Sequence, residues 1–231
     1  MTDKQVLQEL EALGNEQTRK TYRRHGVSGK QYGVSFANLG KLQKKIKTDH
    51  DLAGKLWASG VHDAQVLATM IADPTTMTAK EIDTWSKSLS NYVLTDVLAG
   101  LVSKTPLSRK KAEQWSKSKE EWLGSAGWQI LNWLAARDAE LPDGFFLPYL
   151  DTIQSAIHTR RNRVRYAMNG ALISIGARNG SLRKKALAVA AKIGKVEVDH
   201  GDTGCKTPDA ANYIRKIVER KEQSQSKAAK A

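Results

Sequence analysis

The sequence contains one cysteine, Cys205, so no internal disulfide can form. This favours a reducing compartment, and we expect a cytoplasmic protein. No segment approaches the eighteen or so consecutive apolar residues that a membrane helix needs, so no membrane partner is expected. The first ten residues, MTDKQVLQEL, include early acidic side chains and no apolar run, and a secretory signal is therefore not expected.

Several signatures of enzyme chemistry are also missing. The sequence has no glycine-rich phosphate-binding motif, no nucleophilic triad and no nucleotide-cofactor fingerprint. The segment Asp199–Cys205 contains possible metal ligands, but zinc sites normally use paired Cys/His motifs and no second pair is present. We therefore expect neither a cofactor nor a metal site. The segment is interpreted as a loop before a last helix that starts at Thr207-Pro208-Asp209.

Positive charge is concentrated in one part of the chain. The net charge is +13, but residues 1–157 hold 20 Lys and Arg against 18 Asp and Glu. Residues 158–231 hold 17 against 6, a net charge of +11. Such asymmetry indicates a polyanionic partner, usually nucleic acid. A basic surface that serves only solubility is the alternative.

Helical periodicity dominates the sequence. Apolar residues recur at i, i+3, i+4 and i+7, as in Ala64, Leu67, Ala68 and Ile71. Strand-like alternation is limited to Lys195–Asp199. The helical segments form pairs of about thirty residues: Asp49–Ser59 with Val61–Asp73, Ala79–Ser88 with Asn91–Ser103, and Ser108–Ser118 with Glu120–Arg137.

This pattern predicts an all-α solenoid of HEAT-like, armadillo-type repeats, with a compact helical bundle as the alternative. We expect one repeat domain over residues 1–221 and a disordered basic tail over 222–231. The six tryptophans are expected to lie mostly in the core between helices.

Five segments in order resemble the HEAT-like-repeat DNA alkylation repair family, the AlkD-type alkylpurine DNA glycosylases. The resemblance covers roughly residues 5–220 and rests on the order of the segments rather than on one motif. They are His25-Gly26-Val27 with the helix Gly33–Lys47; Leu56-Trp57, His62-Asp63 and Ala68–Pro74; Trp85–Asp96; Trp115–Trp122; and Arg163–Ile175.

The resemblance implies a C-shaped stack of helix pairs that holds double-stranded DNA in a basic concave face. It also implies a monomer that hydrolyses the N-glycosidic bond of N3- or N7-alkylated purines. These bases carry a positive charge that already weakens the bond. Electrostatic stabilisation of the sugar cation and a positioned water then suffice for catalysis.

Asp96 matches the catalytic aspartate of the family, and Tyr92 stands where the family usually has tryptophan. The two residues are four apart, so they share a face of a helix. An aromatic ring there can stabilise positive charge. A helix-surface aspartate beside a partly buried tyrosine is the structural alternative.

This chain departs at two places from the pattern of the active members of the family. Gly124 and Ser125 stand where the family has an arginine pair, and Gly170 stands where it has a tryptophan. The chain is therefore identified as a divergent member. Both a DNA glycosylase and a non-catalytic nucleic-acid-binding protein of the same fold stay open, with a helical-repeat protein scaffold as a third alternative.

The basic residues after His158 are the predicted DNA-binding residues. Arg161, Arg165 and Asn169 are spaced at i, i+4 and i+8 on the polar side of a helix, where they could follow DNA phosphates. Arg178, Arg183, Lys184 and Lys185 extend this stripe beyond the next turn, and Arg163 belongs to the same cluster. A solvated charged face is the alternative.

Overall fold

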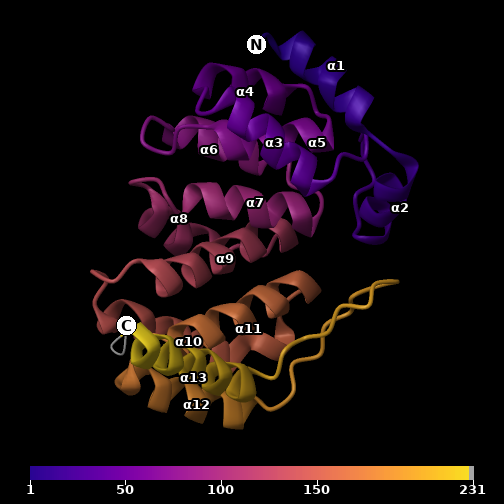
Figure 1. Cartoon of the computed structure of the whole chain (residues 1–231). Coiled ribbons are helices and arrows are strands. Elements are labelled where there is room, and N and C mark those ends of the chain that lie inside the picture. Colours follow the sequence, from indigo (N-terminus) through magenta and orange to yellow (C-terminus); the bar gives the residue numbers. More distant parts are fainter. Residues whose placement is uncertain (229–231) are drawn as a thin grey trace. The chain divides into compact units, whose positions relative to one another are not determined.

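The computed structural model describes residues 1–228, and within them the chain is helical without strands (Figure 1). The single candidate strand, Lys195–Asp199, has no regular secondary structure. The helices are α1 Asp3–Leu13, α2 Glu16–Arg24, α3 Phe36–Ile46, α4 His50–Ala58, α5 His62–Ile71, α6 Ala79–Ser86, α7 Tyr92–Val102, α8 Ser108–Trp115, α9 Glu121–Arg137, α10 Asp143–Ala156, a 3-10 turn at Ile157–Thr159, α11 Asn162–Gly176, α12 Gly180–Ile193 and α13 Ala210–Ala228.

Side-chain caps explain why the helices begin where the sequence predicts. Asp49, Asn91 and Asn179 each accept a hydrogen bond from the backbone three residues later, at the starts of α4, α7 and α12. Thr78 and Glu81 form a reciprocal capping box at α6. Each predicted helix pair is therefore present with its ends displaced by a few residues.

The chain divides into two compact units, and the boundary falls within α8. Unit 1 comprises Met1–Glu113 and Gly201–Gly204, whereas unit 2 comprises Gln114–His200 and the chain from Cys205 onward. In unit 1, α5 packs against α3, α4 and α7 and is buried along nearly all of its length. Trp57 of α4 stacks on Trp85 of α6, with ring centroids 4.3 Å apart and planes 3° from parallel.

Unit 2 is centred on α11, which packs against α9, α12 and α13. Trp115 and Trp128 are 2% and 0% exposed. Together with Trp57 and Trp85, they confirm that most of the tryptophans lie in the core. Gly127 of α9 allows the closest backbone approach, because a Cβ built there would lie 2.2 Å from the Ser116 nitrogen.

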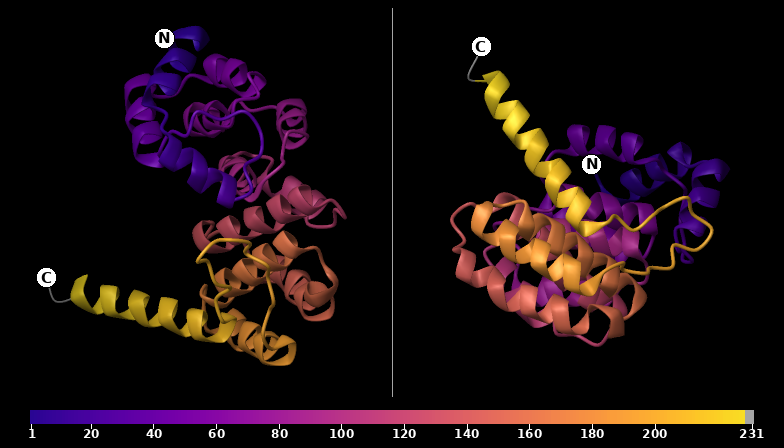
Figure 2. Two further views of the ribbon diagram at one scale, coloured as in Figure 1. Left: turned by 90° about the vertical axis from the view of Figure 1, so that its right-hand side faces the viewer. Right: turned by 90° about the horizontal axis from the view of Figure 1, so that it is seen from below.

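The end of the chain departs from the sequence prediction. After α12 the chain makes a long excursion without helix or strand and then enters α13 (Figure 1). Asp209 accepts the Asn212 N–H at 2.8 Å, so the predicted start signal does begin this helix. α13 continues through Ala228 and projects beyond the other helices of its unit in both views of Figure 2. Residues 222–228 of the predicted disordered tail are therefore helical, and residues 229–231 lie outside the described residues.

No helix in the described part of the chain is long and apolar enough to cross a membrane.

Candidate functional site

The helix α7 carries the predicted catalytic pair. Leu94, Leu98 and Leu101 bury one face of this helix in unit 1. Tyr92 and Asp96 are both half-buried, one helical turn apart, on the remaining face. The two residues therefore share one face of α7, as predicted, with the aromatic ring one turn before the carboxylate.

The structure adds His25 to this pair. The His25 ring nitrogen Nδ1 is hydrogen-bonded to the Tyr92 hydroxyl, and the two rings meet edge to face with centroids 5.7 Å apart. His25 ends α2 and is 67 residues away in the sequence. The sequence could show it only as part of a family segment, because nothing local relates it to α7.

Asp63 has a structural role that the sequence pattern did not reveal. Its carboxylate is completely buried and accepts the backbone N–H groups of Tyr32 and Val34, each at 2.6 Å. The Tyr22 hydroxyl donates to the Val34 carbonyl at 2.6 Å. These bonds hold the segment before α3 against the first turn of α5.

Gly124 and Ser125, which the resemblance aligns with an arginine pair, are tightly packed. A Cβ built at Gly124 would lie 3.0 Å from the Ser118 carbonyl oxygen and 3.2 Å from Val164. Ser125 is 2% exposed, and its hydroxyl donates to the Arg163 carbonyl at 3.3 Å. Both positions therefore lie in a tight contact between α9 and α11, which has no space for an arginine side chain. Gly170, at the position of the family tryptophan, is only in ordinary contact distance of Asn132.

The predicted arginine stripe on α11 divides into exposed and buried residues. Arg161 is exposed at the start of α11, and Arg165 is half-buried, with its guanidinium 3.4 Å from the Asn162 side-chain oxygen. Asn169, in contrast, is 1% exposed, and its amide donates to the Pro208 carbonyl at 2.9 Å. The expectation that Asn169 lies on the polar face is wrong, because the segment before α13 covers it.

Arg163 and Arg178 are also used inside unit 2. Arg163 is 8% exposed, and its guanidinium lies 4.5 Å from the centre of the Tyr166 ring. The Arg178 guanidinium donates to backbone carbonyls at the end of α9 and just after it, including those of Ala135, Asp138 and Leu141. These arginines therefore make contacts inside unit 2, and their role in DNA binding stays a prediction.

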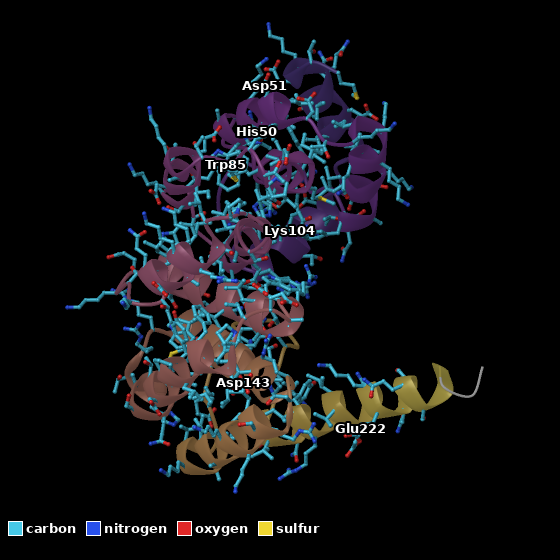
Figure 3. The ribbon with its side chains drawn as sticks, turned by 90° about the vertical axis from the view of Figure 1, so that its left-hand side faces the viewer. His50, Asp51, Trp85, Lys104, Asp143 and Glu222 are labelled. Carbon is cyan, nitrogen blue, oxygen red and sulfur yellow. The ribbon has the colours of Figure 1, made fainter. Side chains whose placement is uncertain are left out.

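α12 presents the remaining predicted basic residues. Lys184 and Lys185 are exposed, and Arg183 is half-buried, 3.9 Å from the Glu222 carboxylate of α13. Figure 3 labels Glu222 on the projecting helix. Arg161, Arg165, Arg183 and Lys184 are thus the predicted DNA-binding residues that have solvent access.

The segment Asp199–Cys205 forms a loop. His200 hydrogen-bonds through Nε2 to the Thr207 hydroxyl at 3.0 Å and packs edge to face on Tyr166. Burial, and then the charge of Arg163, lowers the pKa of His200 below its usual value. Among residues 1–228, no cluster of three or more His, Cys, Asp or Glu side chains has a geometry that could hold a metal ion.

Comparisons with known proteins agree with this architecture. A family model described as "DNA alkylation repair enzyme" matches residues 6–224. "Uncharacterized protein Lmo0209" of Listeria monocytogenes is 34% identical over 226 residues, which cover 95% of this chain and 99% of that protein. "Uncharacterized protein Lin0241" of Listeria innocua matches with the same identity and coverage.

A solved structure is similar over nearly the whole chain. It is described as "a new family of proteins related to the HEAT-like repeat DNA glycosylases with affinity for branched DNA structures". It superposes with a TM-score of 0.87 at 33% sequence identity and covers 95% of each chain. The predicted HEAT-like all-α fold is thereby confirmed.

Proposed function

Because the chain belongs to the DNA alkylation repair enzyme family and has its HEAT-like fold, we propose that it binds DNA through basic residues of unit 2 and prefers branched DNA. The observation that carries this proposal is the net charge of +11 after residue 157. Arg161 and Lys184 lie exposed within this region, at the starts of α11 and α12. The preference for branches is taken from the affinity described for the similar solved structure.

Phosphate contacts make DNA binding depend on salt. Each contacted phosphate releases counterions, so the logarithm of the binding constant falls with the logarithm of the salt concentration. We expect Arg161→Ala with Arg165→Ala to flatten this slope by up to about two units. Fluorescence anisotropy over a series of salt concentrations measures the slope, with a labelled four-way junction and a duplex of one of its arms.

The matched control removes the same charge from unit 1. Lys41 and Lys44 are exposed on α3, and their double alanine variant changes the net charge by the same two units. We expect the control to change the slope much less than the arginine variant does. Equal slopes for both variants would mean that the net charge of the chain, rather than the start of α11, governs binding. Equal affinity for the junction and the duplex would contradict the proposed preference.

Excision of cationic N3- or N7-alkylated purines is the second candidate function. It is favoured by Asp96 and Tyr92 on one face of α7, with the Tyr92 hydroxyl held by His25. The assay is release of N7-methylguanine or N3-methyladenine from alkylated duplex DNA, compared with Asp96→Asn. Release that survives Asp96→Asn would remove the role assigned to this carboxylate. Absence of release with retained DNA binding would leave DNA binding as the function.

A further inference from the structure

The last turn of α2 fixes the backbone of His25. The helix ends with Gly26 in the left-handed region, at a φ of 80°, which glycine adopts without strain. The Gly26 N–H donates to the Arg23 carbonyl at 2.9 Å. The Val27 N–H donates to the Tyr22 carbonyl at 3.0 Å. These two bonds form a Schellman motif, which holds the residue before the glycine, His25, at the very end of the helix.

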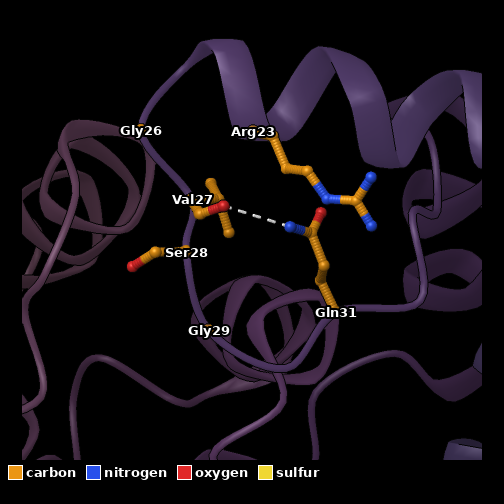
Figure 4. Close-up of a pocket in the computed structure, with 6 residues that line it drawn as sticks. All are labelled: Arg23, Gly26, Val27, Ser28, Gly29 and Gln31. Carbon is orange, nitrogen blue, oxygen red and sulfur yellow. Dashed lines mark hydrogen bonds between the residues drawn. The ribbon is translucent and has the colours of Figure 1, made fainter.

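The segment after Gly26 holds the same turn from its other side. The Gln31 side-chain amide donates to the Val27 carbonyl at 3.1 Å (Figure 4). Tyr22 and Val27, which the longer Schellman bond joins, are both buried. His25 therefore projects its ring from a turn that is anchored by hydrogen bonds and by burial.

Tyr92 is anchored in a similar way at the start of α7. It is the first residue of this helix, and the side chain of the preceding Asn91 accepts the Leu94 N–H at 3.0 Å. Asn91 and Leu94 are 3% and 1% exposed, so this helix start is fixed inside unit 1. The hydrogen bond between the Tyr92 hydroxyl and His25 Nδ1 thus joins two side chains whose backbones are both held in place.

This hydrogen bond decides what the Tyr92 hydroxyl offers to a ligand. A phenol hydroxyl has one proton to donate and lone pairs that accept, and a neutral histidine accepts at one ring nitrogen only. When the ring proton of His25 is on Nε2, Nδ1 accepts the phenol proton. The phenol oxygen then presents only lone pairs to its surroundings, and donating its proton makes it a stronger acceptor.

Asp96 adds a negative charge on the same face of α7. Residues four apart on a helix have Cβ atoms about 5–6 Å from each other. Helical side chains lean toward the helix N-terminus, so the Asp96 carboxylate is directed toward the turn that starts with Tyr92. An aromatic ring, a phenol oxygen and a carboxylate together attract a cation and repel an anion such as phosphate.

We propose that His25 is a positioning residue that holds the Tyr92 hydroxyl as an acceptor, so that Tyr92 and Asp96 bind a positively charged nucleotide. The proposal rests on the second candidate function, which assigns these two residues to cationic purines. It adds the residue that sets the polarity of the site. It also predicts that the site prefers a charged nucleotide to a neutral one of the same shape.

The test compares two DNA duplexes that differ only in the charge of one nucleotide. One duplex contains a pyrrolidine in place of the sugar and base, which is protonated at neutral pH. The other contains the neutral tetrahydrofuran of the same shape. Fluorescence anisotropy with the full chain should show tighter binding of the pyrrolidine duplex, and equal affinities for the two duplexes would overturn the proposal.

Variants of His25 separate positioning from a merely structural role. His25→Leu removes the acceptor and should reduce the preference for the charged duplex about fivefold, the usual loss for one hydrogen bond. His25→Asn keeps an oxygen near the place of Nδ1 and should restore most of the preference. In a Tyr92→Phe background, His25→Leu should have no further effect. Equal losses in both backgrounds, or no rescue by asparagine, would overturn the assigned role.

The matched control is His50→Leu, which replaces another half-buried histidine of unit 1, at the start of α4. We expect it to keep the preference for the charged duplex. An equal loss in His50→Leu and His25→Leu would overturn the proposal, because the loss would then not depend on contact with Tyr92.

Two further measurements complete the test. Long-range ¹H–¹⁵N spectra in slightly alkaline buffer report the His25 ring without DNA, with its signals assigned by their absence in His25→Asn. They should show the proton on Nε2, and a proton on Nδ1 would overturn the acceptor role. Release of alkylated purines separates the proposal from the function on which it rests. Charge preference without release would refute excision alone, whereas release that His25→Leu leaves unchanged would overturn the role of His25 alone.

Discussion

Replacing Asp63 by asparagine should destabilise unit 1 more than any other single isosteric change we identify. The carboxylate is fully buried and accepts two backbone hydrogen bonds of 2.6 Å, from Tyr32 and Val34. Hydrogen bonds to charged groups contribute about 1.5–3 kcal/mol each. Asparagine keeps one acceptor but turns its NH₂ group toward a backbone donor, so one bond is lost and a buried donor is left unsatisfied. We expect the free energy of unfolding to fall by about 3–5 kcal/mol.

Urea unfolding followed by circular dichroism measures this loss, with Asp51→Asn as the control. Asp51 is an exposed acidic residue in the first turn of α4, and its neutralisation should cost no more than about 1 kcal/mol. Because typical domains are stable by only about 5–15 kcal/mol, the Asp63 variant should show a clearly lower midpoint. A decrease of less than about 1 kcal/mol would mean that the two short bonds are not the main anchor of the segment before α3.

Three further changes test other contacts. Gly127→Ala should lower the free energy of unfolding by about 3 kcal/mol, because its Cβ would meet the backbone of Trp115 and Ser116. Gly54→Ala has open space around it and should stabilise α4 by about 0.5–1 kcal/mol, so thermal melts that rank the two variants otherwise would contradict the packing. Thr78→Ala removes the capping box of α6 and should cost about 1 kcal/mol by urea unfolding, and an unchanged midpoint would refute its contribution. Burial lowers the pKa of His62 below 6.5, so at pH values under 6.5 the unfolded state takes up a proton that the native state does not. The free energy of unfolding should therefore decrease as the pH is lowered, by at most about 1.4 kcal/mol per pH unit. The part of this loss that His62 causes should disappear in His62→Phe.

The helices could be predicted from the sequence because their signals are local. A capping residue such as Asn91 acts within one turn of itself, and the apolar periodicity of α5 or α11 spans a few turns. The shared face of Tyr92 and Asp96 follows from the same local geometry, whereas their choice as a catalytic pair came from the family resemblance. These features need no knowledge of what the helix packs against.

The misplaced residues are those whose environment is set by distant segments. The spacing of Asn169 with Arg161 and Arg165 predicts a polar face, but the chain 39 residues later covers Asn169 and accepts its hydrogen bond. Arg178 has a side chain suited to binding phosphate, yet its guanidinium donates to backbone carbonyls at the end of α9 and just after it. The composition of residues 222–228 resembles a disordered tail, but Glu, Gln, Lys and Ala are also good helix formers that continue α13.

The close contact between α9 and α11 also constrains how this protein can evolve. An arginine introduced at position 124 or 125 would have to displace the Ser118 carbonyl, Val164 or the bond between Ser125 and Arg163. An arginine at either position would therefore loosen the packing between α9 and α11. Substitutions at positions 124 and 125 are thereby limited to small side chains, whereas exposed basic positions such as Arg161 and Lys184 can vary without this packing cost.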